Sequence, residues 1–190
     1  MRCFQCHSTG TLKVAQRTVQ PFELGVRCES CHGPGSDHAA KPSKANIRNP
    51  ASGTSAEIND LCGQCHRMPP AAGSATNWTN AWNVRHQPVY LSRSRCFLES
   101  GGKLSCLTCH QPHQDKVSTS ICATCHASVK HTRPIANRPC GSCHMPKVQP
   151  QPYLAFSNHW IGIYKPGSPL QPLSKRGSLT PSPSIIEKPR

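Results

Sequence analysis

The feature that most constrains this chain is a short pattern, Cys-x-x-Cys-His, which occurs six times within 190 residues. Twelve of the 13 cysteines belong to these motifs, and each motif carries a histidine directly after its second cysteine. The motifs span residues 3–7, 28–32, 62–66, 106–110, 122–126 and 140–144. This spacing is the attachment signature of c-type haem.

The chemistry of haem attachment explains the spacing. Two cysteines three residues apart lie on one side of a helical turn, so both thiols can add to the vinyl groups of one porphyrin. The histidine that follows offers a neutral imidazole nitrogen to the iron. The predicted thioether cysteines are Cys3, Cys6, Cys28, Cys31, Cys62, Cys65, Cys106, Cys109, Cys122, Cys125, Cys140 and Cys143. The predicted proximal histidines are His7, His32, His66, His110, His126 and His144.

Other uses of paired cysteines explain the motifs less well. Zinc ribbons contain Cys-x-x-Cys pairs but do not require the adjacent histidine. A disulfide-rich secreted scaffold gives no reason for that histidine, and thioredoxin-like redox pairs occur singly. We therefore predict six covalently bound haem c groups, each with one iron, as the cofactors.

The composition indicates that the polypeptide alone cannot form a conventional core. Only 35% of the residues are hydrophobic and 5% are aromatic, and 19 are prolines. A chain so poor in apolar side chains buries too little surface to offset the entropy lost on ordering it. We therefore predict a multihaem cytochrome c fold, mostly coil with short α-helices around a haem core, with little or no β structure.

Local patterns predict only a few regular elements. A capping-box pattern, Thr54-Ser-Ala-Glu57, predicts a helix that runs through the third motif. Residues 118–120 predict the cap of a helical turn over the fifth motif. Residues 88–91 are at most a short edge strand, and the motifs have no fixed period, which argues against a solenoid.

The charge balance is strongly basic, with 22 Lys and Arg against 8 Asp and Glu and a formal net charge of +14. These residues are scattered, and the longest basic run is Lys175-Arg176, so no arm or stripe typical of nucleic-acid binding is present. Haem propionates offer negative charges that the basic side chains can neutralise. No run of 18 apolar residues exists, so we predict neither a nucleic-acid partner nor a membrane span.

Five histidines outside the motifs are candidate distal ligands: His38, His86, His113, His131 and His159. Five candidates for six irons leave one iron without a distal histidine from this chain. Met68, Met145, a histidine from a neighbouring chain and an open coordination position are the alternatives for that iron.

Two features fall outside this pattern. Cys96 is the unpaired cysteine, for which a buried free thiol and an intermolecular disulfide are the alternatives. We predict a hexahaem domain over residues 1–164, followed by a proline-rich basic tail over 165–190. For this tail, disorder and an extended conformation docked on a partner subunit are the alternatives.

The sequence around the motifs resembles the doubled-CxxCH multihaem c-type cytochromes, relatives of the tetrahaem electron acceptor of hydroxylamine oxidoreductase, in particular bacterial forms fused to tetratricopeptide repeats. The matching stretches are 28–38, 94–113, 140–147 and 156–160. The resemblance implies that His38, His113 and His159 are distal ligands. This sequence differs from the family at Asn158, where the family usually has aspartate, so a charge that could orient the ligand imidazole is missing.

The resemblance also implies an upstream haem segment and an export signal. Haem c is attached outside the cytoplasm, so we expect a periplasmic or extracellular protein whose signal peptide was removed or is missing from this sequence. The expected partners are redox proteins or copies of this chain, with an oligomer or filament as one form of assembly.

These observations predict electron transfer through closely packed, mostly bis-histidine haems, without a catalytic residue. One alternative is a multihaem reductase or oxidase, in which an open haem acts on nitrogen or sulfur oxyanions. The other is a subunit of a polymeric cytochrome filament or of a larger electron-transfer complex, in which neighbours share a ligand or the tail.

Overall fold

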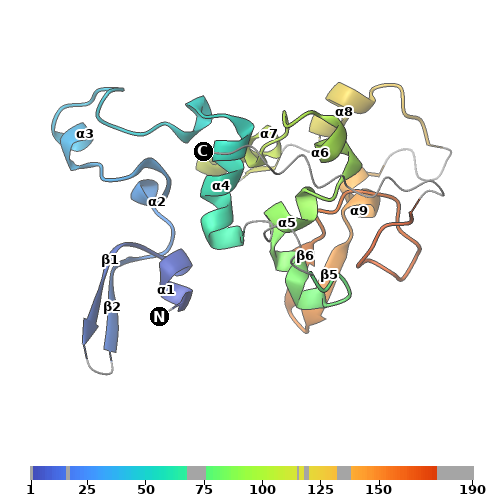
Figure 1. Cartoon of the computed structure of the whole chain (residues 1–190), viewed down its shortest axis with the longest axis horizontal. Helices are drawn as coiled ribbons and strands as arrows, with labels where there is room; N and C mark the ends of the chain where they lie inside the picture. The colour runs from blue at the N-terminus through green and yellow to red at the C-terminus, as the bar shows by residue number, and fades with distance from the viewer. Residues whose placement is uncertain are drawn as a thin grey trace. The chain divides into compact units, whose positions relative to one another are not determined.

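The computed structural model describes residues 2–15, 18–67, 76–114, 116–117, 120–131 and 138–174. The chain divides into two compact units, residues 1–65 and residues 66–190. Each unit consists of short helices and small two-stranded ribbons joined by irregular segments (Figure 1).

In the first unit, an antiparallel ribbon follows the first motif. Helix α1 (Arg2–His7) leads directly into strand β1 (Ser8–Ala15), which pairs with strand β2 (Thr18–Leu24). Ser8 lies opposite Leu24, and the register shifts between Thr9 and Leu12. The elements that follow are α2 (Cys28–His32), α3 (Ser36–Ala40) and the 3-10 helix η1 (Pro50–Ser52).

Helix α4 (Ser55–His66) begins at the predicted capping box. The backbone N–H of Thr54 donates to Oε2 of Glu57 at 2.7 Å, and the N–H of Glu57 donates to Oγ1 of Thr54 at 3.3 Å. These two bonds satisfy N–H groups that the first turn of a helix leaves without backbone partners. Ile58 is buried, and the helix ends at the histidine of the third motif, so the predicted helix is confirmed.

The second unit has a small apolar core. Val84 and Tyr90 are fully buried, and Val89 and Val148 are almost so. Trp78, Ala81, Phe156, Trp160 and Leu170 pack against this cluster. The elements of the unit are η2 (Ala81–Arg85), α5 (Gln87–Leu91), α6 (Arg95–Glu99), α7 (Cys106–Cys109), β3 (His110–Gln111), η3 (Pro112–Gln114), β4 (Lys116–Val117), α8 (Ile121–His126), α9 (Cys140–His144), β5 (Lys147–Gln151) and β6 (Leu154–Ser157).

The prediction of an edge strand over residues 88–91 is wrong, because these residues form most of helix α5. Pro88 lies in the first turn, where its missing N–H leaves no helical hydrogen bond unmade. Val89 and Tyr90 then point into the apolar core. The cap predicted for the fifth motif falls partly on Ser118 and Thr119, outside the described residues, and Ser120 precedes α8 without a side-chain capping bond.

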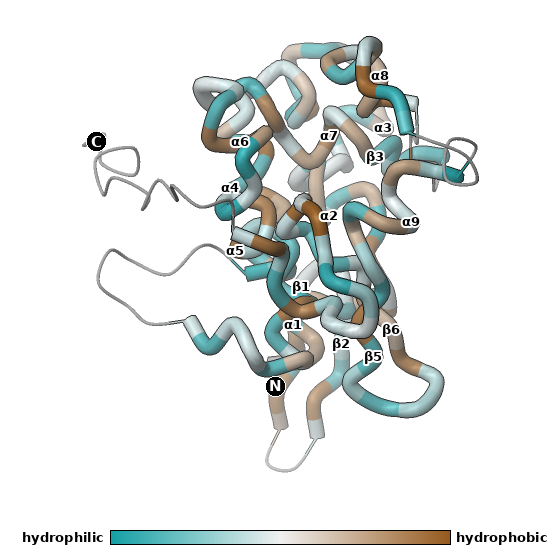
Figure 2. Tube along the Cα trace, turned by 90° about the vertical axis from the view of Figure 1, so that its right-hand side faces the viewer, coloured by the Kyte–Doolittle hydropathy of each residue, from teal (hydrophilic) through white to brown (hydrophobic). Residues whose placement is uncertain are grey.

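The predicted fold class is confirmed: the described chain is mostly coil with short helices, and its strands form three separate two-stranded ribbons. Hydrophobic and hydrophilic residues are interspersed along the trace (Figure 2). Five hydrophobic side chains among the described residues are buried: Ile58, Val84, Val89, Tyr90 and Val148. No helix in the described ranges has the length and apolar character that a bilayer crossing requires.

Candidate functional site

All six Cys-x-x-Cys-His motifs lie on helical turns. The first, second, fifth and sixth motifs lie within the short helices α1, α2, α8 and α9. The third motif ends α4, and the fourth runs from α7 into β3. The cysteines in these motifs are free thiols, and none is fully buried. Because residues three apart share one side of a helical turn, each pair presents two thiols to the same side. The motifs therefore fit the attachment of one porphyrin to each turn.

Three proximal histidines are held through the ring nitrogen Nδ1. His32 Nδ1 lies 2.7 Å from the carbonyl oxygen of Arg48, and His144 Nδ1 lies 2.8 Å from that of Gly162. An oxygen acceptor at this distance requires the proton on Nδ1, which leaves the lone pair of Nε2 free for a metal.

The third of these histidines differs, because its acceptor is a side chain. His66 Nδ1 lies 2.9 Å from Oε1 of Gln87, the first residue of α5. Gln87 is held in place because Pro88, Val89 and Tyr90, which follow it, are buried. The partner of a ligating histidine sets the basicity of its imidazole. A glutamine side chain can be changed by substitution, whereas a backbone carbonyl cannot.

Distal candidate His38 lies on α3, close to the second motif. Its Nδ1 is 3.1 Å from Oδ1 of Asn46 and 3.1 Å from the carbonyl oxygen of Ser43, and the backbone N–H of Ser43 donates to it at 3.3 Å. The Asn46 amide group donates to the carbonyls of Asp37 and Lys41, so its Oδ1 faces the imidazole. The two oxygens can accept from a protonated Nδ1, whereas the Ser43 N–H donates to an unprotonated one, so Nδ1 has a partner in either tautomer.

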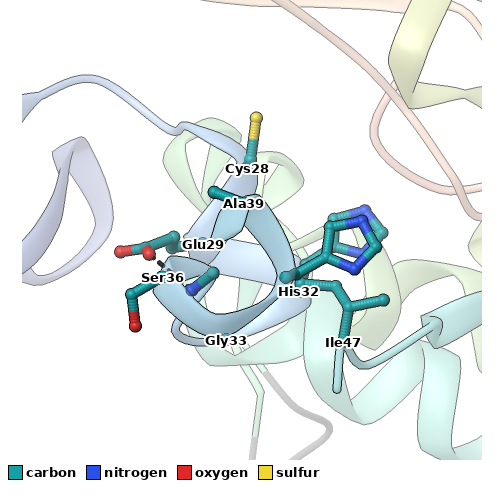
Figure 3. Close-up of a pocket in the computed structure, with 9 residues that line it drawn as sticks. Cys28, Glu29, His32, Gly33, Ser36, Ala39 and Ile47 are labelled. Atoms are coloured by element: carbon teal, nitrogen blue, oxygen red, sulfur yellow. Dashed lines mark hydrogen bonds between the residues drawn. The ribbon is translucent and has the colours of Figure 1, made fainter. Parts of the chain in front are cut away.

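His32 and His38 line the same cavity, with a volume of about 420 Å³. Figure 3 shows Cys28 and His32 projecting from α2, with Ile47 beside the imidazole. Oε1 of Glu29 accepts a hydrogen bond from the N–H of Gly35 at 2.7 Å, which closes the turn between α2 and α3. The cavity thus brings together a thiol, a proximal imidazole and apolar walls, as an attached porphyrin requires.

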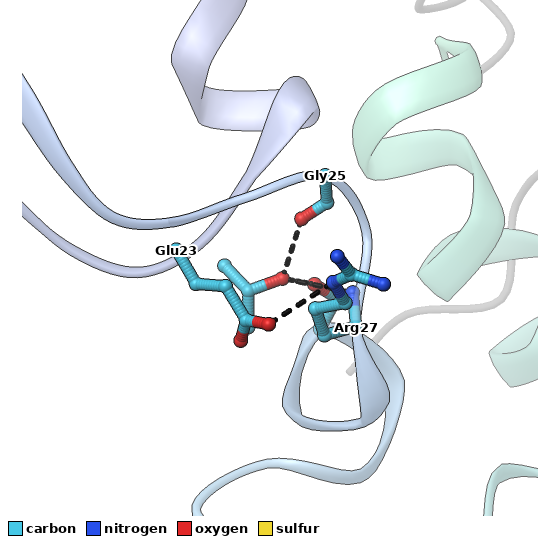
Figure 4. A network of polar contacts seen from close by, with 5 residues as sticks. Glu23, Gly25 and Arg27 are labelled. Carbon is cyan, nitrogen blue, oxygen red and sulfur yellow. Dashed lines mark hydrogen bonds and ion pairs between the residues drawn. The ribbon is translucent and has the colours of Figure 1, made fainter.

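A polar network fixes the start of helix α2 against the ribbon of the first unit (Figure 4). The buried Oγ1 of Thr9 donates to the carbonyl of Gly25 at 2.8 Å, accepts from the N–H of Arg27 at 2.9 Å and lies 2.7 Å from Oγ of Ser30. Glu23 pairs with Arg27 at 3.0 Å. The second motif is therefore positioned from strand β1.

Two histidine pairs have the geometry that a shared iron would need. The ring centroids of His110 and His159 are 6.2 Å apart at an interplanar angle of 16°, and those of His131 and His144 are 5.9 Å apart at 29°. Two imidazoles on opposite faces of one metal, each about 2 Å from it, place their centroids about 6 Å apart. In each pair, one ring comes from a motif and the other is a distal candidate.

The electrostatic surroundings of His159 favour a neutral ring. Burial lowers the pKa of His159 to about 4, and His110, His66 and Lys147 act in the same direction. Its Nδ1 lies 3.0 Å from the carbonyl oxygen of Ser157. The ring is thus neutral near pH 7, and Nε2 is the nitrogen left for coordination.

The remaining two distal candidates have different surroundings. Burial, with Arg67 and Arg85, lowers the pKa of His86 to about 4, and Nε of Arg85 lies 3.4 Å from Nε2 of His86. His113 is exposed in η3.

The other residues singled out from the sequence are only partly described. Met68 and residues 175–190 of the tail lie outside the described ranges, while Met145 follows α9 and is half-buried. Cys96 is a half-buried free thiol on α6. The supporting residues Gln87, Asn46 and Gly162 carry no sequence signal, because a hydrogen-bond acceptor for a histidine has no fixed spacing from it.

Comparisons with known proteins find multihaem cytochromes similar to this chain. A family model described as cytochrome c554 and c-prime matches residues 1–33. The C-type polyheme cytochrome OmcC of Geobacter sulfurreducens is 29% identical over 156 residues, covering 57% of this chain and 20% of that protein. The multiheme cytochrome MtrA of Shewanella baltica is 26% identical over 174 residues, covering 76% of this chain and 45% of that protein.

Among solved structures, an undecaheme cytochrome from the S-layer of Carboxydothermus ferrireducens is similar, with a TM-score of 0.44 and 18% identity. The match covers 76% of this chain and 37% of that chain. The present chain therefore spans less than half the length of each of these three relatives.

Proposed function

We propose that this chain, a multihaem c-type cytochrome, transfers single electrons through six haem c groups, one attached at each of its six motifs. The observation that carries the proposal is the repeated motif on a helical turn, with two free thiols and a histidine. Haem c supplies an iron that alternates between the ferric and ferrous states, at a potential set by its axial ligands and their hydrogen bonds.

Contacts within the chain hold and orient the histidines that we propose as iron ligands. Two axial pairs are proposed from the ring geometry: His110 with His159, and His144 with His131. Hydrogen bonds at Nδ1 hold the imidazoles of His144 and His159, so that Nε2 of each would be the nitrogen that ligates the iron of a bound haem. Bis-histidine ligation of this kind suits a carrier, because no coordination position is left for a substrate.

The basic residues of the chain are proposed to balance the negative charge of the haems. A net charge of +14 on the polypeptide is offset when Lys and Arg neutralise the propionates of six porphyrins. Because so few hydrophobic side chains are buried within the described residues, we propose that the attached porphyrins complete the core of each unit.

The proposed location and partners follow from the cofactor. Covalent attachment of haem c takes place outside the cytoplasm, so we place the chain in the periplasm or at the cell exterior. Its proposed partners are other redox proteins or further copies of this chain. A neighbouring copy could also supply the sixth distal ligand, for which this chain has no histidine left.

A spectroelectrochemical titration of the haem-loaded protein tests the proposed function. We expect six electrons per chain to be taken up reversibly, each iron following a one-electron curve. Uptake of no electrons, with zinc bound stoichiometrically at the cysteines, would contradict the proposal. Variant Cys143→Ala, which breaks one attachment turn, serves as the matched control and should lower the uptake by one electron when its haem is lost.

A further inference from the structure

The segment that follows strand β6 is organised around one fully buried amide side chain, that of Asn158. Its Nδ2 donates to the carbonyls of Pro169 at 2.8 Å and Leu170 at 3.1 Å. Its Oδ1 accepts from the backbone N–H of Trp160 at 2.9 Å. Asn158 therefore ties residues 169–170 to the loop that begins at its own position.

The arm formed by residues 165–173 is packed as well as hydrogen-bonded. Leu170 lies against the apolar core of the second unit. A Cβ built on Gly162 would lie 2.5 Å from Cβ of Pro172, so only glycine lets the arm come this close. The N–H of Leu173 donates to the carbonyl of Ile163 at 2.6 Å. The arm thus covers the loop over residues 158–164.

The covered loop is the one that contacts both proposed axial pairs. The carbonyl of Gly162 accepts from Nδ1 of His144, and the N–H of Gly162 donates to the carbonyl of His144 at 3.1 Å. On the other side, Oγ of Ser94 donates to the carbonyl of His159 and accepts from the N–H of Ile161, both at 2.8 Å. One loop therefore positions a proximal imidazole and a distal imidazole that belong to different irons.

The chemistry of residue 158 decides whether the arm can be held. An asparagine offers two N–H donors and one carbonyl oxygen, which match the two carbonyls and the one N–H that surround it. An aspartate has no donor when ionised, so two buried carbonyls would face a carboxylate oxygen. Contrary to the expectation that residue 158 concerns the charge beside the ligand, its side chain faces the arm, and His159 bonds to the carbonyl of Ser157 instead.

We propose that Asn158 is a positioning residue that acts through the arm: it clamps residues 165–173 over the 158–164 loop and thereby fixes the imidazoles of His144 and His159. The inference rests on the proposed function, because it concerns two of the six proposed irons. It predicts that releasing the arm changes the two irons ligated by His144 and His159 together and leaves the other four unchanged.

The test compares three full-length, haem-loaded variants with the wild type. Asn158→Asp removes the two donors, and Leu170→Ala weakens the packing of the arm on the apolar core while leaving the Asn158 side chain itself unchanged. Asn83→Asp is the matched control. Asn83 lies on η2, and its amide also donates to a backbone carbonyl, that of Asn77, at 2.9 Å. The readouts are the haem content, the EPR signals of the low-spin irons, and hydrogen exchange over residues 158–174.

In Asn158→Asp, we expect exchange of the arm to be about ten- to a hundredfold faster, because buried carbonyl acceptors lose their donors. The EPR signals of two irons should shift, and Leu170→Ala should shift the same two signals. Asn83→Asp should leave them unchanged.

Unchanged EPR signals in both Asn158→Asp and Leu170→Ala, with full haem content, would overturn the inference. If Asn158→Asp does not fold, Leu170→Ala decides the question alone: a shift in the two signals supports the inference, and no shift overturns it. Fewer than six haems in the wild-type protein would instead contradict the proposed function.

Discussion

The imidazoles of His110 and His159 lie nearly parallel, with their ring centroids 6.2 Å apart, although the first ends an attachment motif and the second follows strand β6. Burial keeps His159 neutral, with a pKa of about 4, and a backbone carbonyl holds its Nδ1. The polypeptide therefore places the imidazole of His110 and the neutral imidazole of His159 at the separation that one iron between them would require.

The first prediction concerns this pair. Replacing His159 with alanine should leave the haem of the fourth motif without its distal ligand, so one iron should become high-spin and bind carbon monoxide when reduced. His131→Ala should do the same to the haem of the sixth motif, and the double variant should show two such irons. Optical and EPR spectra check this, and a fully low-spin spectrum for His159→Ala would contradict the pairing.

The second prediction concerns the hydrogen bond from His66 to Gln87. In Gln87→Glu, an ionised carboxylate should accept this bond more strongly and make the imidazole a better donor to iron, which lowers the midpoint potential of one haem. We expect a shift of about tenfold in its reduction equilibrium, which is about 59 mV for one electron.

Redox titration of the haem-loaded variants measures the shift. The control is Gln149→Glu, which adds the same charge at an exposed position on β5. Gln87→Leu should raise the same potential, because the bond is lost. Equal shifts in Gln87→Glu and Gln149→Glu would show that only the added charge matters.

How much the sequence could predict differs between the attachment turns and their surroundings. The six motifs and the Thr54–Glu57 capping box predict helices correctly, because the pattern and the hydrogen bonds that it forms are local. The stretch 88–91 reads as a strand, but its burial against Trp78 and Val148 stabilises helix α5 instead. Tertiary packing decided this element, and no local pattern reports that packing.

In the candidate site too, the features set by local sequence could be predicted, and those set by tertiary contacts could not. The spacing of the motifs identifies the cysteines and the histidines that follow them, whereas the partner of each histidine depends on contacts between distant segments. His144 is held by the carbonyl of Gly162, and a backbone carbonyl is present at every position. The ribbon formed by β1 and β2 has no counterpart in the sequence predictions either, although Thr9 within it fixes the start of α2.

The third prediction concerns pH and helix α4. Hydrogen bonds from Thr54 hold the pKa of Glu57 below its ordinary value of 4.5. A carboxyl whose folded-state pKa is lowered stabilises the fold above its unfolded pKa, and that contribution is lost as the pH falls through the folded value. Glu57→Ala should therefore lower the thermal midpoint by a few degrees at pH 7 and by progressively less below pH 4.5.

Thermal unfolding followed by far-UV circular dichroism at several pH values checks this prediction. Asp60→Ala, at an exposed acid of the same helix, is the control, and it should show no comparable pH dependence. A difference between wild type and Glu57→Ala that stays constant down to pH 2 would show that the ionised carboxylate does not account for the effect, and would contradict the prediction.

The fourth prediction concerns Cys96, the cysteine outside the motifs. If the twelve other cysteines are consumed as thioethers, the denatured holoprotein should react with one equivalent of a thiol reagent, and Cys96→Ser should react with none. In the folded protein the reaction should be slow, because burial raises the pKa of the Cys96 thiol. Two or more reactive thiols in the denatured protein would indicate a motif without haem.

The most direct test of the account is the number of haems bound covalently to one chain. Intact-protein mass spectrometry after acid-acetone extraction, combined with a pyridine haemochrome assay, gives this number, because extraction removes any haem that is not attached through thioethers. The account predicts six haems per chain, all retained through extraction. Fewer than six, or haem that is lost during extraction, would contradict it.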